Sequence, residues 1–373
     1  MHSPIICEVL RTSQQGDVPE SLHRGHIAVV DASGTLLFSL GDPHFRTFAR
    51  SVLKPFQLAG VIESGAADDF AFSRKELAIM AGSHSGSTSH LEVVEGILSK
   101  IGLDETALEC GAHMPRDPEQ STLISQGKLR LCQLHDNCSG KNSGMLSICV
   151  KNGWDHKNYG SLSHNVQRYV LGKVREILEL PRLEDVAFAI DGCGVPTPYL
   201  ELRTLAMGFA RLAGARGSGA GAVRTATRAG AGRSTTRAGS PANGVAVVQG
   251  LPCSSSLERV REAMMAYPEM VAGEGRVCTA IIRSTRGRAV AKGGGEGIYC
   301  IGDAGKAIGV CLKIEDGSPR AVAPAAIEVM HQLGLLGEKQ LEELKDFRTT
   351  PVTNHSGAVV GKVSPCFKLE KRN

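Results

Sequence analysis

The chain has 373 residues, 42% of them hydrophobic and 21% charged, so it is long enough to bury one large core or two smaller ones. A net charge of +4 is too small to indicate nucleic-acid binding, and no segment reaches the roughly 20 apolar residues needed to cross a bilayer. The N-terminal segment MHSPIICEVLR meets an acid and an arginine too early for a secretory signal. The eleven cysteines are therefore interpreted as reduced thiols, and we expect a cytoplasmic protein.

The first part of the chain is predicted to form antiparallel strands. Apolar runs cover His26 to Asp31 and Thr35 to Ser39, and the turn between them indicates a hairpin. Apolar residues at helical spacing follow Ser51, and Ser73 with Glu76 forms a capping box that opens the next helix. Periodicity predicts further helices over 90–101, 166–178 and 200–212.

The middle of the chain decides the fold class. Residues 186–190 are continuously apolar, which is typical of a strand buried on both faces of a sheet. Because helices and strands alternate, we predict an α/β fold. Residues 214–245 contain five arginines, no acid and otherwise mostly small residues. Such a segment has too little apolar surface to offset the entropy of ordering, so a flexible surface insertion or linker is predicted there.

The last third of the chain returns to regular patterns. A helix is predicted over 256–265, followed by strands around 287–292, 297–300 and 307–314 and an apolar helix over 324–335. The tail from Lys339 is charged and is expected to be peripheral, although 354–357 predicts a turn before a final strand.

The most informative motif is Ser51-x-x-Lys54, placed at the start of a predicted helix. Residues three apart share a helix face, so the Lys54 amine can reach the Ser51 hydroxyl. A desolvated lysine can take the proton of a serine nucleophile, as in hydrolases that work without histidine. Taken alone, the motif is better explained by an ordinary helical turn with a solvated lysine.

Two clusters of small and polar residues follow. Residues 81–86, with Ser83 and His84, can present hydroxyls or amides to a ligand, or can simply end the preceding helix. Residues 135–144 combine a thiol, an imidazole, an amine and amides before an apolar helix expected to begin near Met145. Free amides there can bind a substrate carboxylate or serve as an N-terminal cap.

Two later motifs complete the set. In 190–198, Asp191 can hold a substrate ammonium at the end of the predicted buried strand, or can cap the next helix. Cys138 and Cys193 stand singly, so their spacing favours free thiols over zinc, although thiolates do select zinc. Lys292 is followed by three glycines, and no phosphate-binding pattern surrounds it.

Taken in order, these motifs resemble the L-asparaginase II family, the class 3 or Rhizobium etli-type asparaginases. The resemblance covers about residues 8–363 and omits 214–245, which leaves a catalytic domain over 1–363 and a tail over 364–373. The residues that carry it are Arg50-Ser51-x-x-Lys54-Pro55, Ser83-His84-Ser85-Gly86, Asn137-Cys138-Ser139-Gly140-Lys141, Asp191-Gly192-Cys193-x-x-Pro196-Thr197-Pro198, Val271-Ala272-Gly273-Glu274-Gly275-Arg276, Ala291-Lys292-Gly293-Gly294, Glu315-Asp316-Gly317 and Asn354-His355-x-Gly357.

The resemblance implies a fold of two α/β subdomains similar to serine β-lactamases, a homodimer, and hydrolysis of L-asparagine to L-aspartate and ammonia. It also implies two facing Ser-Lys pairs, with Arg50, His84 and Asp191 around the substrate. A zinc ion that supports substrate binding rather than supplying the attacking group is implied as well. The catalytic pairs would be Ser51 with Lys54 and Ser83 with Lys292, and the metal ligands Cys138, Lys141 and Cys193.

The working hypothesis makes Ser51 the acylated serine with Lys54 as its base, while Ser83 and Lys292 relay protons; the sequence does not decide which serine attacks. Two nearby lysines lower each other's pKa, so one can be the base while the other stays cationic. Asn142 and Ser87 replace a histidine and a glutamate that commonly follow their motifs. The alternatives are a Ser-x-x-Lys peptidase or β-lactamase-like hydrolase, and an inactive zinc-binding homologue.

Overall fold

The computed structural model describes residues 3–216 and 253–372, and the predicted insertion 214–245 lies largely outside these residues. Its helices are α1 Lys54–Glu63, α2 Ala66–Asp69, α3 Arg74–Met80, α4 Thr88–Lys100, α5 Pro118–Ser125, α6 Ser139–Asn152, α7 Asn165–Leu178, α8 Leu202–Gly214, α9 Ser254–Ala266, α10 Pro268–Val271, α11 Val277–Ser284, α12 Val322–Gln332, α13 Glu338–Glu343 and α14 Lys345–Arg348. A short 3-10 turn, η1 (Arg50–Leu53), leads into α1.

The strands are β1 Ile5–Ser13, β2 Gly16–Asp31, β3 Leu36–Leu40, β4 Arg46–Phe48, β5 Phe188–Ile190, β6 Pro196–Glu201, β7 Ala289–Gly293, β8 Ile298–Asp303, β9 Ile308–Ile314, β10 Thr350–Thr353, β11 Val359–Pro365 and β12 Glu370–Lys371. Within the described residues, nine of them form one sheet in the order β10-β11-β1-β2-β9-β8-β7, with β3 paired to β2 and β12 paired to β3. The pairs are antiparallel. The predicted mixture of helices and strands is confirmed.

The core lies where helix α8 packs against the centre of this sheet. Every residue of β8 and β9 is buried, and α8 lies against both strands. The approach is very close at Gly309, where an added Cβ would meet the Ala206 carbonyl oxygen at 1.8 Å. A side chain at this position would force the helix away from the sheet.

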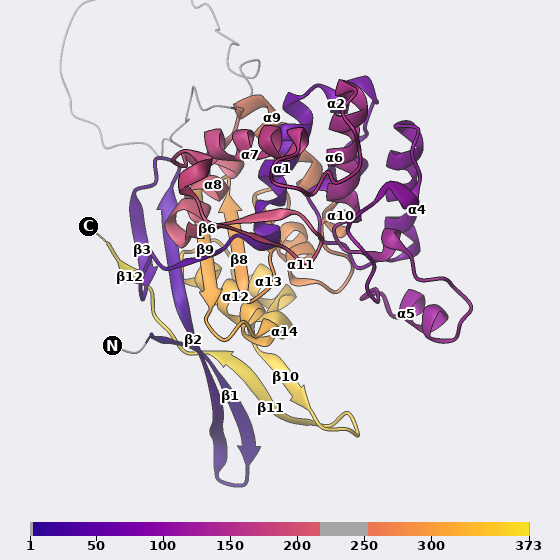
Figure 1. Ribbon diagram of the computed structural model, residues 1–373. Coiled ribbons are helices and arrows are strands. Elements are labelled where there is room, and N and C mark those ends of the chain that lie inside the picture. Colours follow the sequence, from indigo (N-terminus) through magenta and orange to yellow (C-terminus); the bar gives the residue numbers. More distant parts are fainter. Residues whose placement is uncertain (1–2, 217–252, 373) are drawn as a thin grey trace, which may run out of the picture.

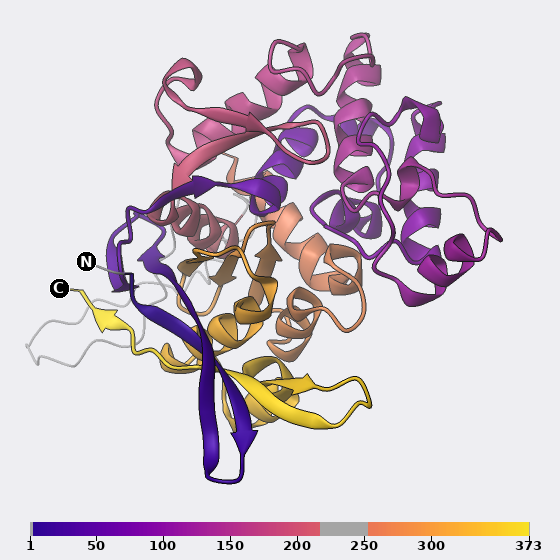
Figure 2. The ribbon, with the colours of Figure 1, turned by 60° about the horizontal axis from the view of Figure 1, so that its bottom comes forward.

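Figures 1 and 2 show a second group of helices, including α2, α4, α5 and α6, to one side of the sheet. The β1–β2 hairpin and β10–β11 extend from the opposite end of the molecule as a narrow ribbon. The candidate site lies where the helical group meets the sheet, because α1, α3 and α6 pack on one another and η1 contacts β7 and β8.

Several sequence expectations hold. Strands β2 and β3 form the predicted hairpin, and Ser73 and Glu76 form the predicted capping box, with each side chain bonded to the other residue's backbone N–H. The strands predicted on either side of Lys292 and before residue 314 are present as β7, β8 and β9.

Two expectations are wrong. The strand predicted over 186–190 is not buried on both faces: β5 is a short strand of a small antiparallel sheet, β4-β6-β5, and Ile190 is 66% exposed. Asp191 therefore lies in a tight turn between β5 and β6. Helix α6 begins at Ser139, not near Met145, because burial of its first turns outweighs the low helix propensity of Ser139–Gly144.

The end of the chain joins the sheet. Strand β11 runs to Pro365 beside β1, and β12 pairs with β3. Among the described helices, none is both long and apolar enough to traverse a lipid bilayer.

Candidate active site

Lys54 opens helix α1, and its side chain is buried at the centre of the site. Its Nζ donates to the Gly82 carbonyl at 2.6 Å, to Ser83 Oγ at 2.9 Å and to the Asn137 carbonyl at 3.3 Å. Three acceptors match the three N–H groups of an ammonium. The surroundings of Lys54 therefore suit a cation.

Ser83 follows α3 and is held between two lysines. Its backbone N–H donates to the Val271 carbonyl at 2.8 Å, which fixes the loop. Lys292, near the end of β7, brings its Nζ to 2.8 Å from Ser83 Oγ and donates to the Gly293 carbonyl at 2.7 Å. The Ser83 hydroxyl thus contacts both amines.

Ser51 and Lys54, which their spacing predicts to lie within reach of each other, are not hydrogen bonded in the described residues. Within the described residues, Lys54 Nζ donates to Gly82, Ser83 and Asn137, and the Ser51 hydroxyl has no hydrogen bond. Ser51 lies in the 3-10 turn η1, before α1 begins, whereas the Lys54 side chain turns to the loop after α3. The pairing of Ser83 with Lys292 is present as predicted; the catalytic roles of both pairs stay predictions.

Lys292 has an unusual proton affinity. Burial and the neighbouring charge of Lys54 lower its pKa to about 7. Removing water disfavours the charged amine, and a second cation disfavours it further. A lysine with such a pKa exchanges its proton readily at neutral pH.

Arg50 and Asp191 form one wall of a small pocket beside Lys54. Arg50 Nε lies 2.8 Å from Asp191 Oδ1, in an ion pair that is not aligned as a hydrogen bond. Arg50 adopts a left-handed φ of 51°, and its N–H donates to Thr197 Oγ1 at 2.8 Å. Ser51 also lines this pocket. The predicted grouping of Arg50, Ser51, Lys54 and Asp191 is therefore observed.

The glycines after Lys292 allow the sheet to press against this wall. A Cβ on Gly294 would lie 3.2 Å from the Arg50 Cβ, 3.4 Å from the Ser51 nitrogen and 2.5 Å from Ile298 Cγ2. Any side chain at this position would force its neighbours to shift. The glycine run thus brings Lys292 and Ser51 into one site.

His84 is buried and bonded to protein groups through both ring nitrogens. The Gly86 N–H donates to Nδ1 at 3.1 Å, so Nε2 is assigned the proton and donates to Ser139 Oγ at 2.8 Å. Burial, and after it the charge of His90, lower the pKa of His84 well below its ordinary value. This neutral ring holds the Ser83 loop against α6, and the geometry does not favour its predicted contact with substrate.

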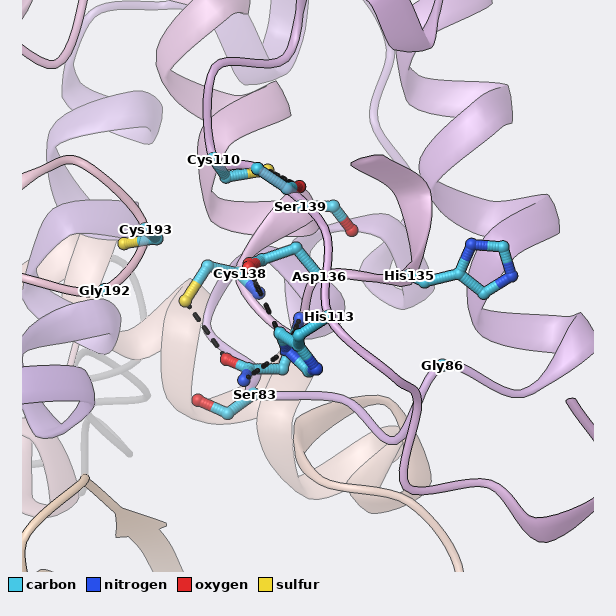
Figure 3. A network of polar contacts seen from close by, with 12 residues as sticks. Ser83, Gly86, Cys110, His113, His135, Asp136, Cys138, Ser139, Gly192 and Cys193 are labelled. Atoms are coloured by element: carbon cyan, nitrogen blue, oxygen red, sulfur yellow. Dashed lines mark hydrogen bonds and ion pairs between the residues drawn. The ribbon is translucent and has the colours of Figure 1, made fainter. Parts of the chain in front are cut away.

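Cys138, Lys141 and Cys193 come together beside the pocket, all buried. Figure 3 shows Cys193 and Cys138 on two different segments of the chain, and Ser83 on a third. Lys141 Nζ donates to Cys193 Sγ at 2.8 Å, and Cys138 Sγ donates to Asn137 Oδ1 at 3.1 Å. The neighbouring Cys193, and after it burial, raise the pKa of Cys138 well above its ordinary value.

Cys138, Lys141 and Cys193 alter one another's pKa values. The neighbouring Cys138 thiol, and after it the Lys141 charge, lower the pKa of Cys193 despite its burial. Burial lowers the pKa of Lys141, but the neighbouring Cys193 and Cys138 raise it overall. The three side chains form a buried ammonium–thiolate pair with a second thiol.

This donor set fits a soft divalent metal ion. Two sulfurs and an amine already face one another, and thiolates are the ligands that zinc prefers, provided that Lys141 releases its proton. Over residues 3–216 and 253–372, no three His, Cys, Asp or Glu side chains form a metal-binding group, so Lys141 would be the third donor.

Sequence reasoning missed two parts of the site. The first is the Asn137 carbonyl, which accepts a hydrogen bond from Lys54. Because the acceptor is a backbone atom, the residue type gives no sign of this contact. Gln57, buried and lining the pocket, is a second. Its position one turn after Lys54 on α1 was the available signal.

Solved structures with some likeness to the chain include crystal structures of Mglu. The native form in 4.3 M NaCl is 15% identical over 84% of this chain and 63% of Mglu, with a TM-score of 0.36. The glutamate form is 15% identical over 84% and 61%, with a TM-score of 0.35. The chain thus spans less than two thirds of the Mglu chain.

A β-lactamase from Mycobacterium bovis is 14% identical over 83% of this chain and 94% of its own, with a TM-score of 0.38. The resemblance stated above implied a fold similar to serine β-lactamases, and a β-lactamase is among the similar solved structures. Its TM-score is too low to support an argument about the fold. None of the curated proteins matches the chain.

The family comparison is decisive. The model of the family described as L-asparaginase II matches residues 11–365, nearly the whole chain, and includes every motif named above that lines the site. The chain belongs to the L-asparaginase II family.

Proposed function

We propose that the protein hydrolyses L-asparagine to L-aspartate and ammonia, with Ser83 as the nucleophile and Lys292 as its base. One observation carries the proposal: Ser83 Oγ lies 2.9 Å from Lys54 Nζ and 2.8 Å from Lys292 Nζ. A serine becomes a nucleophile when a neighbouring base takes its proton. Family membership supports the amide substrate.

The hydrogen bonds support opposite roles for the two lysines. Lys54, with three acceptors, acts as the ammonium and donates to Ser83 Oγ. A neutral Lys292 has two N–H groups and one lone pair, so it donates to the Gly293 carbonyl and accepts the Ser83 proton. Its pKa of about 7 makes the neutral form available at physiological pH.

In the first half-reaction, Ser83 Oγ bonds to the amide carbon while its proton passes to Lys292 Nζ. The two lysine cations then stabilise the oxyanion of the tetrahedral intermediate. The carbon–nitrogen bond breaks as Lys292 returns the proton to the leaving nitrogen, and ammonia departs. In the second half, water attacks the Ser83 ester with its proton going to Lys292, and that proton restores the Ser83 hydroxyl as aspartate leaves.

Cys138, Lys141 and Cys193 would hold a zinc ion, which would supply a positive charge that helps bind the substrate. The steps above are carried by Ser83 and the two lysines. A homodimeric assembly and a cytoplasmic location, both expected from the sequence, are further proposals.

Ammonia release from L-asparagine tests the activity, with L-glutamine and a penicillin as comparison substrates. We expect S83A to lose about 10⁴-fold or more in kcat, as removal of a nucleophile does in other hydrolases, and to keep its unfolding midpoint. S99A, which removes an exposed serine on α4, is the matched control. A diazoketone analogue of asparagine should alkylate Ser83, identified by peptide mass spectrometry.

Ser51 is the other hydroxyl that this site offers, and the same measurements decide between the two. An S51A variant without turnover, together with alkylation at Ser51, would identify Ser51 as the nucleophile instead. Penicillin hydrolysis without ammonia release from asparagine would replace the proposal with the β-lactamase-like alternative.

A further inference from the structure

Arg276 lies on a segment that contacts Ser83 and Gly293, the residue after Lys292. The segment joins α10 to α11. At its start, the Val271 carbonyl accepts the Ser83 N–H at 2.8 Å, and the Ala272 carbonyl accepts Ser85 Oγ at 2.8 Å. At its end, Cys278 Sγ lies 3.9 Å from where a Cβ on Gly293 would stand, next to Lys292. Arg276 is placed between these two contacts.

The acids near Arg276 in the sequence are paired elsewhere. Both oxygens of Glu274 accept from Arg283 at 2.6 Å, and Glu269 Oε2 lies 3.5 Å from the same arginine. Thr279 Oγ1 donates to the Gly273 carbonyl at 2.7 Å and holds the loop in shape. In the described part of the chain, the Arg276 guanidinium is left with no hydrogen bond or ion pair.

Arg276 has a positively charged neighbour. Burial, and next the charge of Arg116, lower the pKa of Arg276. Arg116 lies on a loop beside Ser85, because the following Asp117 N–H donates to the Ser85 carbonyl at 2.9 Å. The charge of Arg276 also acts on Lys292. A half-buried guanidinium without a counter-ion is unfavourable, and it favours binding of an anion.

We propose that Arg276 binds the α-carboxylate of the substrate, with Arg116 adding positive charge beside it. A guanidinium presents two parallel N–H groups that match a carboxylate. The inference rests on the proposed function, because asparagine carries such a carboxylate besides its side-chain amide. It defines the substrate class as side-chain amides of amino acids with a free α-carboxylate, and it makes Arg276 a specificity-determining residue.

The test compares L-asparagine with L-asparagine α-N-methylamide, whose α-carboxylate is replaced by a neutral amide. Wild type should favour asparagine in kcat/KM by roughly 10- to 100-fold, the range expected for hydrogen bonds to a charged group. R276Q should raise the KM for asparagine by a similar factor with kcat within about threefold, and should lose the preference. R276K should recover part of the lost affinity because it restores the charge.

R286Q is the matched control, because it removes the same charge from an exposed arginine just beyond the far end of α11. An unchanged KM in R276Q, or a preference for asparagine that survives the substitution, overturns the inference and leaves the proposed function standing. If wild type releases no ammonia from asparagine, the proposed function fails, and calorimetric titration with L-aspartate decides about Arg276. Affinity at least tenfold weaker in R276Q supports the site, whereas equal affinity or no binding to wild type overturns it.

Discussion

Lys292 Nζ lies 2.8 Å from Ser83 Oγ, although 209 positions separate the two residues in the chain. Lys292 comes from the end of β7 and Ser83 from the loop after α3, so the contact forms only when the sheet and the helical group pack together. Burial in this junction, together with the charge of Lys54, lowers the pKa of Lys292 to about 7. The packing of the fold thereby creates a base.

The first prediction concerns the pH dependence of kcat/KM for asparagine. The base must be neutral, and the folded protein protonates Lys292 as the pH falls through about 7. Activity should therefore be maximal above about pH 8 and should fall with unit slope at lower pH. At one pH unit below the pKa it should be about tenfold lower. Initial rates of ammonia release between pH 5 and 9 measure this profile.

The K292R variant is its control, because an arginine keeps its charge throughout this range. It should lose at least about 10²-fold in kcat, the lower end of what general-base catalysis contributes. A wild-type profile that stays flat from pH 5 to 8 would show that another group titrates, or that no proton transfer at Lys292 limits the rate.

Much of the fold was accessible from local patterns. Two apolar runs separated by a turn in 26–39 predicted the β2–β3 hairpin, and Ser73 with Glu76 predicted the start of α3, because both features depend on neighbours in the sequence. The burial of β5 was predicted wrongly for the opposite reason. An apolar run does not reveal whether other elements cover its faces, and none covers Ile190.

Most residues of the site could be predicted from the sequence, but not which of them contact one another. The spacing of Ser51 and Lys54 favours a contact if both lie on one α-helix. The 3-10 turn before α1 and the arrival of Gly82 and Asn137 turn Lys54 to Ser83 instead. Contacts that depend on three segments packing together leave no local periodicity in a sequence.

The second prediction concerns Gly294, where a side chain has no room. In G294A the new methyl group would stand 2.5 Å from Ile298 Cγ2, so the loop after Lys292 must move. We expect a loss of about 1–3 kcal/mol in unfolding free energy, typical of overpacking. Since the Gly293 carbonyl that accepts from Lys292 moves too, kcat should fall by about 10- to 100-fold.

Gly172 on α7 provides the matched control, because a Cβ there has nothing within 4 Å. G172A should raise the unfolding free energy by about 0.5–1 kcal/mol through helix propensity and should leave kcat unchanged. Urea unfolding and ammonia release on both variants give the comparison. Full activity in G294A would show that the loop tolerates displacement.

The third prediction concerns metal content. If Cys138, Lys141 and Cys193 hold zinc, the purified protein should contain about one zinc ion per chain by elemental mass spectrometry. C193A removes one sulfur donor and should contain almost none. C366S, which changes an exposed cysteine, should keep the wild-type content. Equal zinc in C193A and wild type would place the metal elsewhere.

The final prediction separates two roles for Arg50 and Asp191, whose side chains are 30% and 14% exposed and lie 2.8 Å apart. If the ion pair mainly positions the wall of the pocket, each of R50Q and D191N leaves a charge unpaired, and the double variant relieves it. The coupling energy from urea unfolding should then be about 0.5–3 kcal/mol, and the double variant should regain part of the kcat/KM lost by either single variant. If both residues instead bind the substrate directly, as the sequence predicted, the losses in kcat/KM should add and the double variant should be the least active. Because the left-handed backbone of Arg50 and its bond to Thr197 fix this wall whether or not substrate is bound, we expect the coupled result.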